Sequence, residues 1–336
     1  MKLHFRSLIA ALFAAAVFYA PGAEAGPYYD GKNVTIIVPN SPGGRMSLYA
    51  RTMAPYLQKH LGAADVRIEN RQGGGGLKGT NVLWVAEPDG LTIAFTNVPT
   101  LIMAQLANSP GVQFDSTKFT YLGRVSADPR VITVGANSGI KTIQDVMGRG
   151  KPFVFASQGT DEDFYTMVIL ADALGYELKI ITGYEGQSDT ELAVIKGDAD
   201  GQMSGWGGTK AAVANGDKLP ILFATNERQE VAPEVPTVFE VLKDDSKKAA
   251  VEAVVAILDT SRGFFGPPEM NADATKEMRA AITATLNDPE FLGVAQGQAL
   301  EIVPASGDEI AASVSKIIAA GDELKALLKQ ALESIQ

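Results

Sequence analysis

The sequence predicts an α/β protein of two lobes with a ligand cleft between them. Strand and helix patterns alternate in the first part of the chain, and the same alternation returns in a second part. The chain has 336 residues, which is enough for two separate hydrophobic cores. It contains no cysteine, so a fold of this size has to be held by its cores and not by disulfides.

The first residues resemble an export signal. Lys2 and Arg6 precede the apolar run Leu8–Phe18, and Ala23-Glu24-Ala25 places small residues where a signal peptidase cuts. The run is about half the roughly 20 residues that a membrane span needs. An uncleaved anchor and a buried helix are the alternatives. We predict cleavage after Ala25 and export to the periplasm.

Composition excludes several classes of protein. The formal net charge of −10, without a basic patch, argues against nucleic-acid binding. The only histidines are His4, inside the signal, and His60, so catalytic triads and histidine-based zinc sites lack their parts. We therefore expect no catalytic residue, no metal, no cofactor and no enzymatic activity.

The first part of the chain reads as strand, helix, strand, helix, strand. Val34–Pro39 is a β-branched apolar run typical of a buried strand, and the helix that follows, Ser47–Leu61, stops at Gly62. The next expected elements are the strand Val66–Glu69, the helix Lys78–Ala86 and the strand Leu91–Thr96. This order predicts a parallel, doubly wound sheet.

The second part repeats the pattern. Its expected strands are Val131–Val134, Phe153–Ala156, Leu178–Thr182, Gly201–Ser204 and Ile221–Ala224, with helices at Asp161–Leu174 and Asp189–Ile195. Three further helices are expected at Asn271–Leu286, Pro289–Gln296 and Gly307–Ile335. We predict a signal at residues 1–25, a first lobe from residues 26–124 and 225–336, and a second lobe from residues 125–224. Two chain crossings would then form a hinge.

The ligand site should lie in the loops that follow strands, because open α/β sheets bind ligands beyond the carboxyl ends of their strands. The first such loop opens a helix, whose unpaired N–H groups and positive dipole end suit a carboxylate. Arg45 could add a bidentate grip; the alternative is a solvated arginine beside a helix capped by Ser47. The candidates here are Asn40, Ser41, Gly43, Gly44, Arg45 and Met46.

A second small polar loop opens the helix after the strand Phe153–Ala156. Its candidates are Ser157, Gln158, Gly159, Thr160 and Asp161. The acidic first turn Asp161-Glu162-Asp163 either complements the helix dipole or contacts a cation on the ligand. Further candidates at strand ends are Thr96, Asn97, Tyr184 and Trp206. Trp206 could stack on a planar ligand or simply pack against the lobe.

One glycine motif is interpreted as coincidental. Residues 74–79 match G-x-G-x-x-G between a strand and a helix. A dinucleotide site also needs an acidic residue at the end of the next strand, which here ends in Thr96-Asn97.

Taken together, these segments resemble the extracytoplasmic binding component of tripartite tricarboxylate transporters, the Bug or TctC-like family. The family's first loop, P-F-x-P-G-G-x-T-D with A-R shortly after, is similar to Pro39–Ser47 followed by Ala50-Arg51. Its E-N-R-x-G-A-G-G is similar to Glu69–Gly76, and its Y-A-S-x-G to Phe155–Gly159. Further matches are Pro88-Asp89-Gly90, Thr96-Asn97, Tyr184-Glu185-Gly186, Gly197–Asp200 and Pro233–Thr237.

The resemblance implies a type II periplasmic binding protein that closes on its ligand like a Venus flytrap. It implies a carboxylate held by the first loop and the Ser157 loop, often through water. It also implies delivery of the solute to membrane transporter subunits, and we expect a monomer. The chain departs from the family at Arg45, Ser47 and the acidic turn after Thr160, and Ser204 stands where an acidic residue is common. We keep Ser204 as a candidate, and a standard tricarboxylate is not the expected ligand.

Two other functions fit the same sequence. A periplasmic sensor would present its ligand to a membrane kinase, and the same fold serves both roles. An exported enzyme would need a matched acid and base in the cleft, and the sequence offers only scattered carboxylates.

Overall fold

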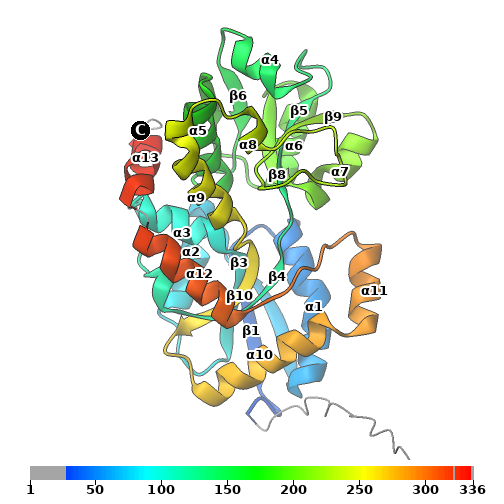
Figure 1. Cartoon of the computed structure of the whole chain (residues 1–336). Helices are drawn as coiled ribbons and strands as arrows, with labels where there is room; N and C mark the ends of the chain where they lie inside the picture. The colour runs from blue at the N-terminus through cyan, green and yellow to red at the C-terminus, as the bar shows by residue number, and fades with distance from the viewer. Residues whose placement is uncertain (1–27, 321, 334–336) are drawn as a thin grey trace, which may run out of the picture.

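The computed structural model describes residues 28–320 and 322–333, so the expected signal at residues 1–25 lies outside the described residues. Two sheets divide the molecule, and we call the part built on each sheet lobe 1 and lobe 2 (Figure 1). The two-lobe α/β fold predicted from the sequence is confirmed. Among the described residues, no helix is long and apolar enough to cross a membrane.

Lobe 1 contains a mixed sheet. Its strands lie in the spatial order β11 (Ala305–Ser306), β4 (Phe119–Ser126), β10 (Arg262–Pro268), β3 (Thr92–Asn97), β1 (Asn33–Val38) and β2 (Asp65–Asn70). The three N-terminal strands pair in parallel, as the strand and helix order predicts. The expectation of a purely parallel sheet is incorrect, because β10 runs antiparallel to both β3 and β4.

Helices cover both faces of the lobe 1 sheet. Side chains alternate along β1, so that Val34, Ile36 and Val38 join one core while Ile37 joins the other. The first core includes α1 (Arg45–Leu61), α10 (Ala272–Leu286) and α11 (Pro289–Gly297). The second includes α2 (Leu77–Trp84), α3 (Val98–Leu106) and α12 (Gly307–Ala320).

Lobe 2 is built on a five-stranded sheet. Its order is β7 (Leu178–Ile181), β6 (Phe153–Ala156), β8 (Gly201–Gly205), β5 (Arg130–Gly135) and β9 (Lys218–Phe223). Around it lie α4 (Ile143–Gly148), α5 (Glu162–Leu174), α6 (Gln187–Lys196) and α7 (Trp206–Ala214).

The chain crosses between the sheets twice. Residues 127–129 connect β4 to β5, and the return from β9 to β10 passes through α8 (Val238–Val241) and α9 (Lys248–Leu258). The C-terminal α13 (Asp322–Glu333) packs against α3, α5 and α9. Because α9 and α13 touch elements of both lobes, the lobe boundaries at residues 124 and 225 stay a prediction. The C-terminal helix expected at Gly307–Ile335 is described as α12 and α13, which lie on either side of residue 321.

Candidate functional site

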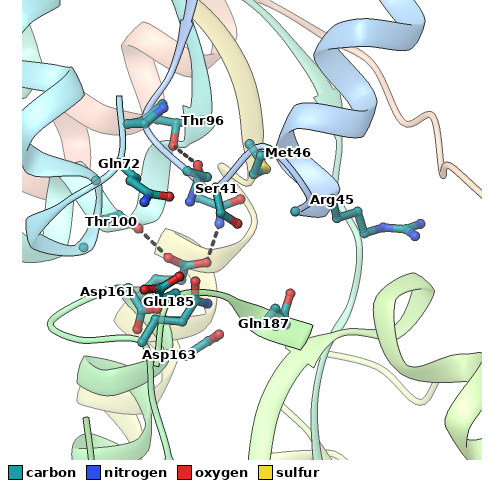
Figure 2. Close-up of a pocket in the computed structure, with 18 of the residues that line it drawn as sticks. Ser41, Arg45, Met46, Gln72, Thr96, Thr100, Asp161, Asp163, Glu185 and Gln187 are labelled. Carbon is teal, nitrogen blue, oxygen red and sulfur yellow. Dashed lines mark hydrogen bonds between the residues drawn. The ribbon is translucent and has the colours of Figure 1, made fainter. Parts of the chain in front are cut away.

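A cavity of about 290 Å³ lies between the two lobes, at the carboxyl ends of β1, β3 and β6. It combines three loops and helix starts of lobe 1 with two of lobe 2 (Figure 2). The lining residues are Pro39, Asn40, Ser41, Gly44, Arg45, Met46, Gln72, Gly73, Gly74, Gly75, Gly76, Thr96, Asn97, Thr100, Arg130, Gln158, Asp161, Glu162, Asp163, Gly183, Tyr184, Glu185, Gln187 and Arg262.

The lobe 1 wall is the loop between β1 and α1. Its turn closes through a hydrogen bond from Gly44 N to Ser41 O (3.0 Å), and Ser47 Oγ donates to the same carbonyl (2.8 Å). Asn70 Nδ2 fixes the loop by donating to Asn40 O (2.8 Å). The helix begins after Gly44 with no side-chain cap and no acidic residue in its first turn. Its first N–H groups therefore remain available for an anion, and Ser47 is not the cap.

The lobe 2 wall is the loop between β6 and α5. Asp161 caps α5 by accepting from Phe164 N (3.1 Å). Ser157 turns inward, where its Oγ donates to Gly159 O (2.8 Å) and its side chain is buried. The start of α5 thus already carries acidic residues, in contrast to the start of α1.

A buried charged cluster forms the floor of the cavity. Arg130 of β5 makes an ion pair with Asp163 and lies 3.3 Å from Glu162. Glu162 also accepts from Asn97 Nδ2 (2.6 Å) and from Thr100 Oγ1, so it connects lobe 2 to α3 of lobe 1 (Figure 2). The two walls are therefore joined across the cavity through one carboxylate.

Burial dominates the protonation of this cluster. It raises the pKa of Asp163 to about 7, although the neighbouring Arg130 opposes the change. The pKa of Asp161 is also raised well above its ordinary value, first by burial and then by the charges of Asp163 and Glu162. Arg130 forms ion pairs with two of these three carboxylates and none with Asp161, so the floor carries a surplus of acid.

A second charged group joins the two chain crossings. Arg262, at the start of β10, pairs with Asp128 of the 127–129 linker (3.2 Å), and Gly207 N donates to the same carboxylate (3.0 Å). Burial raises the pKa of Asp128, but Arg262 and the Gly207 N–H outweigh it, so the net shift is downward. Burial and the charge of Asp128 raise the pKa of nearby Glu301 to about 7.

Arg45 lines the cavity with part of its guanidinium engaged, while its Nε has no hydrogen-bond partner among the described residues. Nη2 donates to Ala299 O, and the group lies over the Tyr49 ring, 5.6 Å from its centroid. In Figure 2 the side chain extends away from the acidic residues. The role of Arg45 as a carboxylate grip stays a prediction.

Glycines allow the lobes to approach closely. A Cβ on Gly75 would lie 3.0 Å from Thr160 O of lobe 2, and a Cβ on Gly186 would lie 3.1 Å from Ser41 Oγ of lobe 1. A Cβ on Gly79 would lie 2.7 Å from Pro39 Cβ, so α2 packs against the end of β1 only because no side chain is present. The G-x-G-x-x-G segment is thus explained by close packing.

The predicted site residues divide into two groups. Those that line the cavity are Asn40, Ser41, Gly44, Arg45, Met46, Thr96, Asn97, Gln158, Asp161 and Tyr184. Those outside its lining are Gly43, Ser157, Gly159, Thr160, Ser204 and Trp206. Ser204 is fully buried inside the lobe 2 sheet. Trp206 packs against Phe223, with ring centroids 5.9 Å apart, as its packing interpretation predicts.

Sequence reasoning missed several lining residues. Arg130 and Arg262 come from strands near the two chain crossings, and no local motif marks them. The loop Gln72–Gly76 was noted only for its glycines. Glu185 lies within the singled-out segment Tyr184-Glu185-Gly186 without being chosen as a site residue, and Thr100, Gly183 and Gln187 lie one or a few residues beyond chosen ones. If the search for site residues had continued one helical turn beyond each strand end, it would have included most of these four residues.

A family model described as "Tripartite tricarboxylate transporter family receptor" matches residues 49–324. This chain belongs to that family. Among curated relatives, a UPF0065 protein from the TAR-I ttuE-ttuC' intergenic region of Agrobacterium vitis is 26% identical over 293 residues, which are 85% of this chain and 80% of the relative. The family resemblance seen in the motifs is therefore confirmed.

Solved structures show the same fold. The periplasmic binding protein BugD superposes with a TM-score of 0.73 at 20% identity, covering 90% of this chain and 98% of BugD. MatC from Rhodopseudomonas palustris, solved with bound malate, has a TM-score of 0.73 at 19% identity and covers 88% of this chain and 99% of MatC. Family and fold are those of substrate-binding receptors and not of enzymes.

Proposed function

We propose that this receptor is exported to the periplasm, closes on a small carboxylate-bearing solute and presents it to the membrane subunits of a tripartite transporter. The observation that carries the proposal is the start of α1. Its first turn has no side-chain cap and no acid, and Ser41 and Met46 beside it line the cavity between the lobes. Backbone N–H groups at such a helix start bind a carboxylate, with the helix dipole in support.

Family membership supports the same proposal. The related MatC was solved with malate, a small carboxylate, in a fold that superposes on this chain. The two lobes approach each other closely at Gly75 and Gly186, and a solute that touches both walls would favour closure by its differential affinity.

The first experiment tests carboxylate binding to residues 26–336. We would measure thermal shifts and then calorimetric affinities for a panel of mono-, di- and tricarboxylates, aromatic acids and amino acids. A solute at 100 times its dissociation constant adds about 2.7 kcal/mol to the free energy of unfolding. A panel in which no carboxylate binds would overturn the proposal.

A negative charge introduced at the start of α1 tests whether the carboxylate of the solute binds there. Ser41→Asp puts a carboxylate beside the first turn of α1, where it competes with the solute for the same N–H groups, so we expect at least a tenfold (about 1.4 kcal/mol) loss of affinity. Ser313→Asp adds the same charge on an exposed position of α12 and serves as the control. Equal affinities of the two variants would place the carboxylate elsewhere.

Export is tested separately. The mature protein should be recovered from the periplasmic fraction with Gly26 as its first residue, as measured by mass spectrometry of the intact chain. If the recovered chain retains residues 1–25, the cleavage proposal is wrong and the segment acts as a membrane anchor.

A further inference from the structure

The cavity contains more acidic side chains than are needed to bind a carboxylate solute that carries no positive charge. Its lining includes four acidic side chains, Asp161, Glu162, Asp163 and Glu185, and three arginines, Arg45, Arg130 and Arg262. No lysine occurs in this lining. The formal charges of the lining are therefore −4 from the acids and +3 from the arginines, a small acidic excess.

Two of the three arginines are neutralised by carboxylates of the protein. Arg262 pairs with Asp128, and Arg130 pairs with Glu162 and Asp163. Arg45 donates to the main-chain carbonyl of Ala299, which is uncharged, and in Figure 2 it extends away from the acidic residues. A solute with several carboxylates would therefore find no uncompensated cation near the acidic floor.

Two carboxylates of the lining have no basic partner among the described residues. Asp161 has only 7% of its surface exposed, and the one hydrogen bond that its carboxylate accepts comes from the main-chain N–H of Phe164. Glu185 is exposed and makes no hydrogen bond or ion pair with the described part of the chain. Figure 2 shows both on the lobe 2 side of the cavity. A buried carboxylate without a counter-charge is costly, so it either takes up a proton or requires a ligand that supplies the opposite charge.

A second observation points to a ligand at the same place. Arg130 is 7% exposed and lines the cavity, and its Nε has no hydrogen-bond acceptor among the described residues. A buried donor of this kind is normally satisfied, so an acceptor atom of a bound solute is the simplest partner. The floor therefore offers both a donor and an unpaired carboxylate.

The missing counter-charge is better explained by an organic cation than by a metal ion. Within the described residues, no group of three His, Cys, Asp or Glu side chains is placed so that it could hold a metal. An ammonium group needs fewer ligands, and one or two carboxylates with neutral acceptors satisfy its three hydrogens.

We propose that the solute is a zwitterion, a small carboxylate that also carries an ammonium group, with the ammonium seated against Asp161 and Glu185 and the carboxylate at the start of α1. This inference rests on the proposed function, because it takes the α1 end of the cavity as the carboxylate seat. The positive helix end of lobe 1 and the acidic floor of lobe 2 then bind opposite ends of one molecule.

Protonation gives the proposal a second observable. Burial and the charges of Asp163 and Glu162 raise the pKa of Asp161, while Arg130 and the Phe164 N–H oppose this. A bound ammonium favours the ionised form of Asp161, so binding releases a proton and affinity rises with pH. A solute without a cation has no such effect at this group.

The test compares solutes matched in carbon skeleton. Calorimetry on residues 26–336 would use malate against aspartate, and butyrate against 4-aminobutyrate. We expect the amino member of a pair to bind at least tenfold more tightly, and to release a proton when titrations in two buffers of different ionisation enthalpy are compared. In Asp161→Asn this preference should fall at least tenfold, because the amide keeps the helix cap and removes the charge.

Two further variants complete the design. Asp244→Asn alters an exposed carboxylate that caps a short helical turn, and it should leave all affinities unchanged. Glu185→Gln changes an exposed side chain that the fold does not need, and it should weaken the amino solutes even if Asp161→Asn fails to fold.

The outcomes separate this inference from the proposed function. One outcome is that plain carboxylates bind as tightly as their amino counterparts and that Asp161→Asn and Glu185→Gln have no effect. This outcome would overturn the inference of a zwitterionic solute and leave the proposed carboxylate-binding function intact. Binding of neither member of any pair would overturn both.

Discussion

At the scale of single residues, the main feature of the site is that its buried carboxylates outnumber the arginines that pair with them. Arg130 alone pairs with both Glu162 and Asp163, and all three side chains are less than 9% exposed. Removal of one partner from a buried ionic group is far more costly than removal of the whole group, because the remaining charge loses its compensation.

Arg130→Met tests this dependence. We expect the free energy of unfolding to fall by about 3 kcal/mol at pH 8. The loss should be smaller at pH 5, because Asp163, whose pKa is about 7, is then protonated and needs no counter-charge. Urea denaturation at both pH values measures it. Arg228→Met, which breaks an exposed pair with Glu240, should cost less than about 1 kcal/mol at either pH. A pH-independent loss would show that packing of the arginine stem matters more than its charge.

Substitution of Glu301 should change stability in the opposite direction, so that the variant is more stable than the parent at high pH. Its pKa rises from 4.5 to about 7 in the folded protein, so the folded chain holds a proton that the unfolded chain releases. Stability from this group is therefore lost as pH increases from about 4.5 to 7. Glu301→Gln cannot ionise, and the variant should be more stable than the parent above pH 7 by about 1 kcal/mol, since the side chain is partly exposed and screened by solvent. Denaturation curves at pH 5 and pH 8 should differ less in the variant, whereas Glu230→Gln on the surface should leave the pH dependence unchanged.

The sequence predicted site residues best where the chain itself places them at a strand end. Asn40 and Ser41 follow β1, Thr96 and Asn97 end β3, and all of them line the cavity. The arginines were missed because their position depends on strand pairing across long sequence distances. Arg262, for example, pairs with Asn97 on one side and Ser126 on the other.

At the scale of elements, the same contrast explains which strands could be predicted. The strand β1 is a β-branched apolar run, and its signal is local. The sequence of β10 is RGFFGPP, whose glycines and prolines are depleted in strands, yet β10 lies in the middle of the lobe 1 sheet. Its Gly263 is required there, because a Cβ would lie 2.9 Å from Gly123 O of the neighbouring strand. Tertiary packing, not propensity, sets this element.

The glycine loop before α2 gives a matched pair of variants. Gly74 and Gly75 have similar left-handed backbones, with φ of 59° and 63°, so alanine strains either position by roughly 1–2 kcal/mol. Only at Gly75 does the added Cβ also approach lobe 2, 3.0 Å from Thr160 O; at Gly74 its nearest neighbour is 3.8 Å away. We expect Gly75→Ala to weaken solute binding about tenfold more than Gly74→Ala does, because it disfavours closure. Equal affinities would mean that the bound form is more open than this structure.

At the scale of the whole molecule, the two lobes share a core. One hydrophobic cluster includes Ile37 of lobe 1 and Phe155 of lobe 2, together with residues of α3, α5, α9 and α13. The alternating strand and helix pattern could predict two lobes and the cleft between them. The pattern could not predict that α9 and α13 pack against both lobes. The sequence of an amphipathic helix shows which face is apolar, but not which surface that face contacts.

Leu328 of α13 tests whether this shared core makes the molecule unfold as one unit. Its side chain is fully buried in the cluster that joins α13 to α3 and α5. Leu328→Ala removes packed methyl groups and leaves a cavity, so we expect a loss of about 2–4 kcal/mol and a melting temperature lower by several degrees. Because the cluster spans both lobes, calorimetry should still show a single transition in parent and variant. Leu292→Ala, at a leucine 39% exposed on α11, should lower the melting temperature far less. Two separate transitions, with only one of them shifted by Leu328→Ala, would show that the lobes fold independently and that α13 belongs to one of them alone.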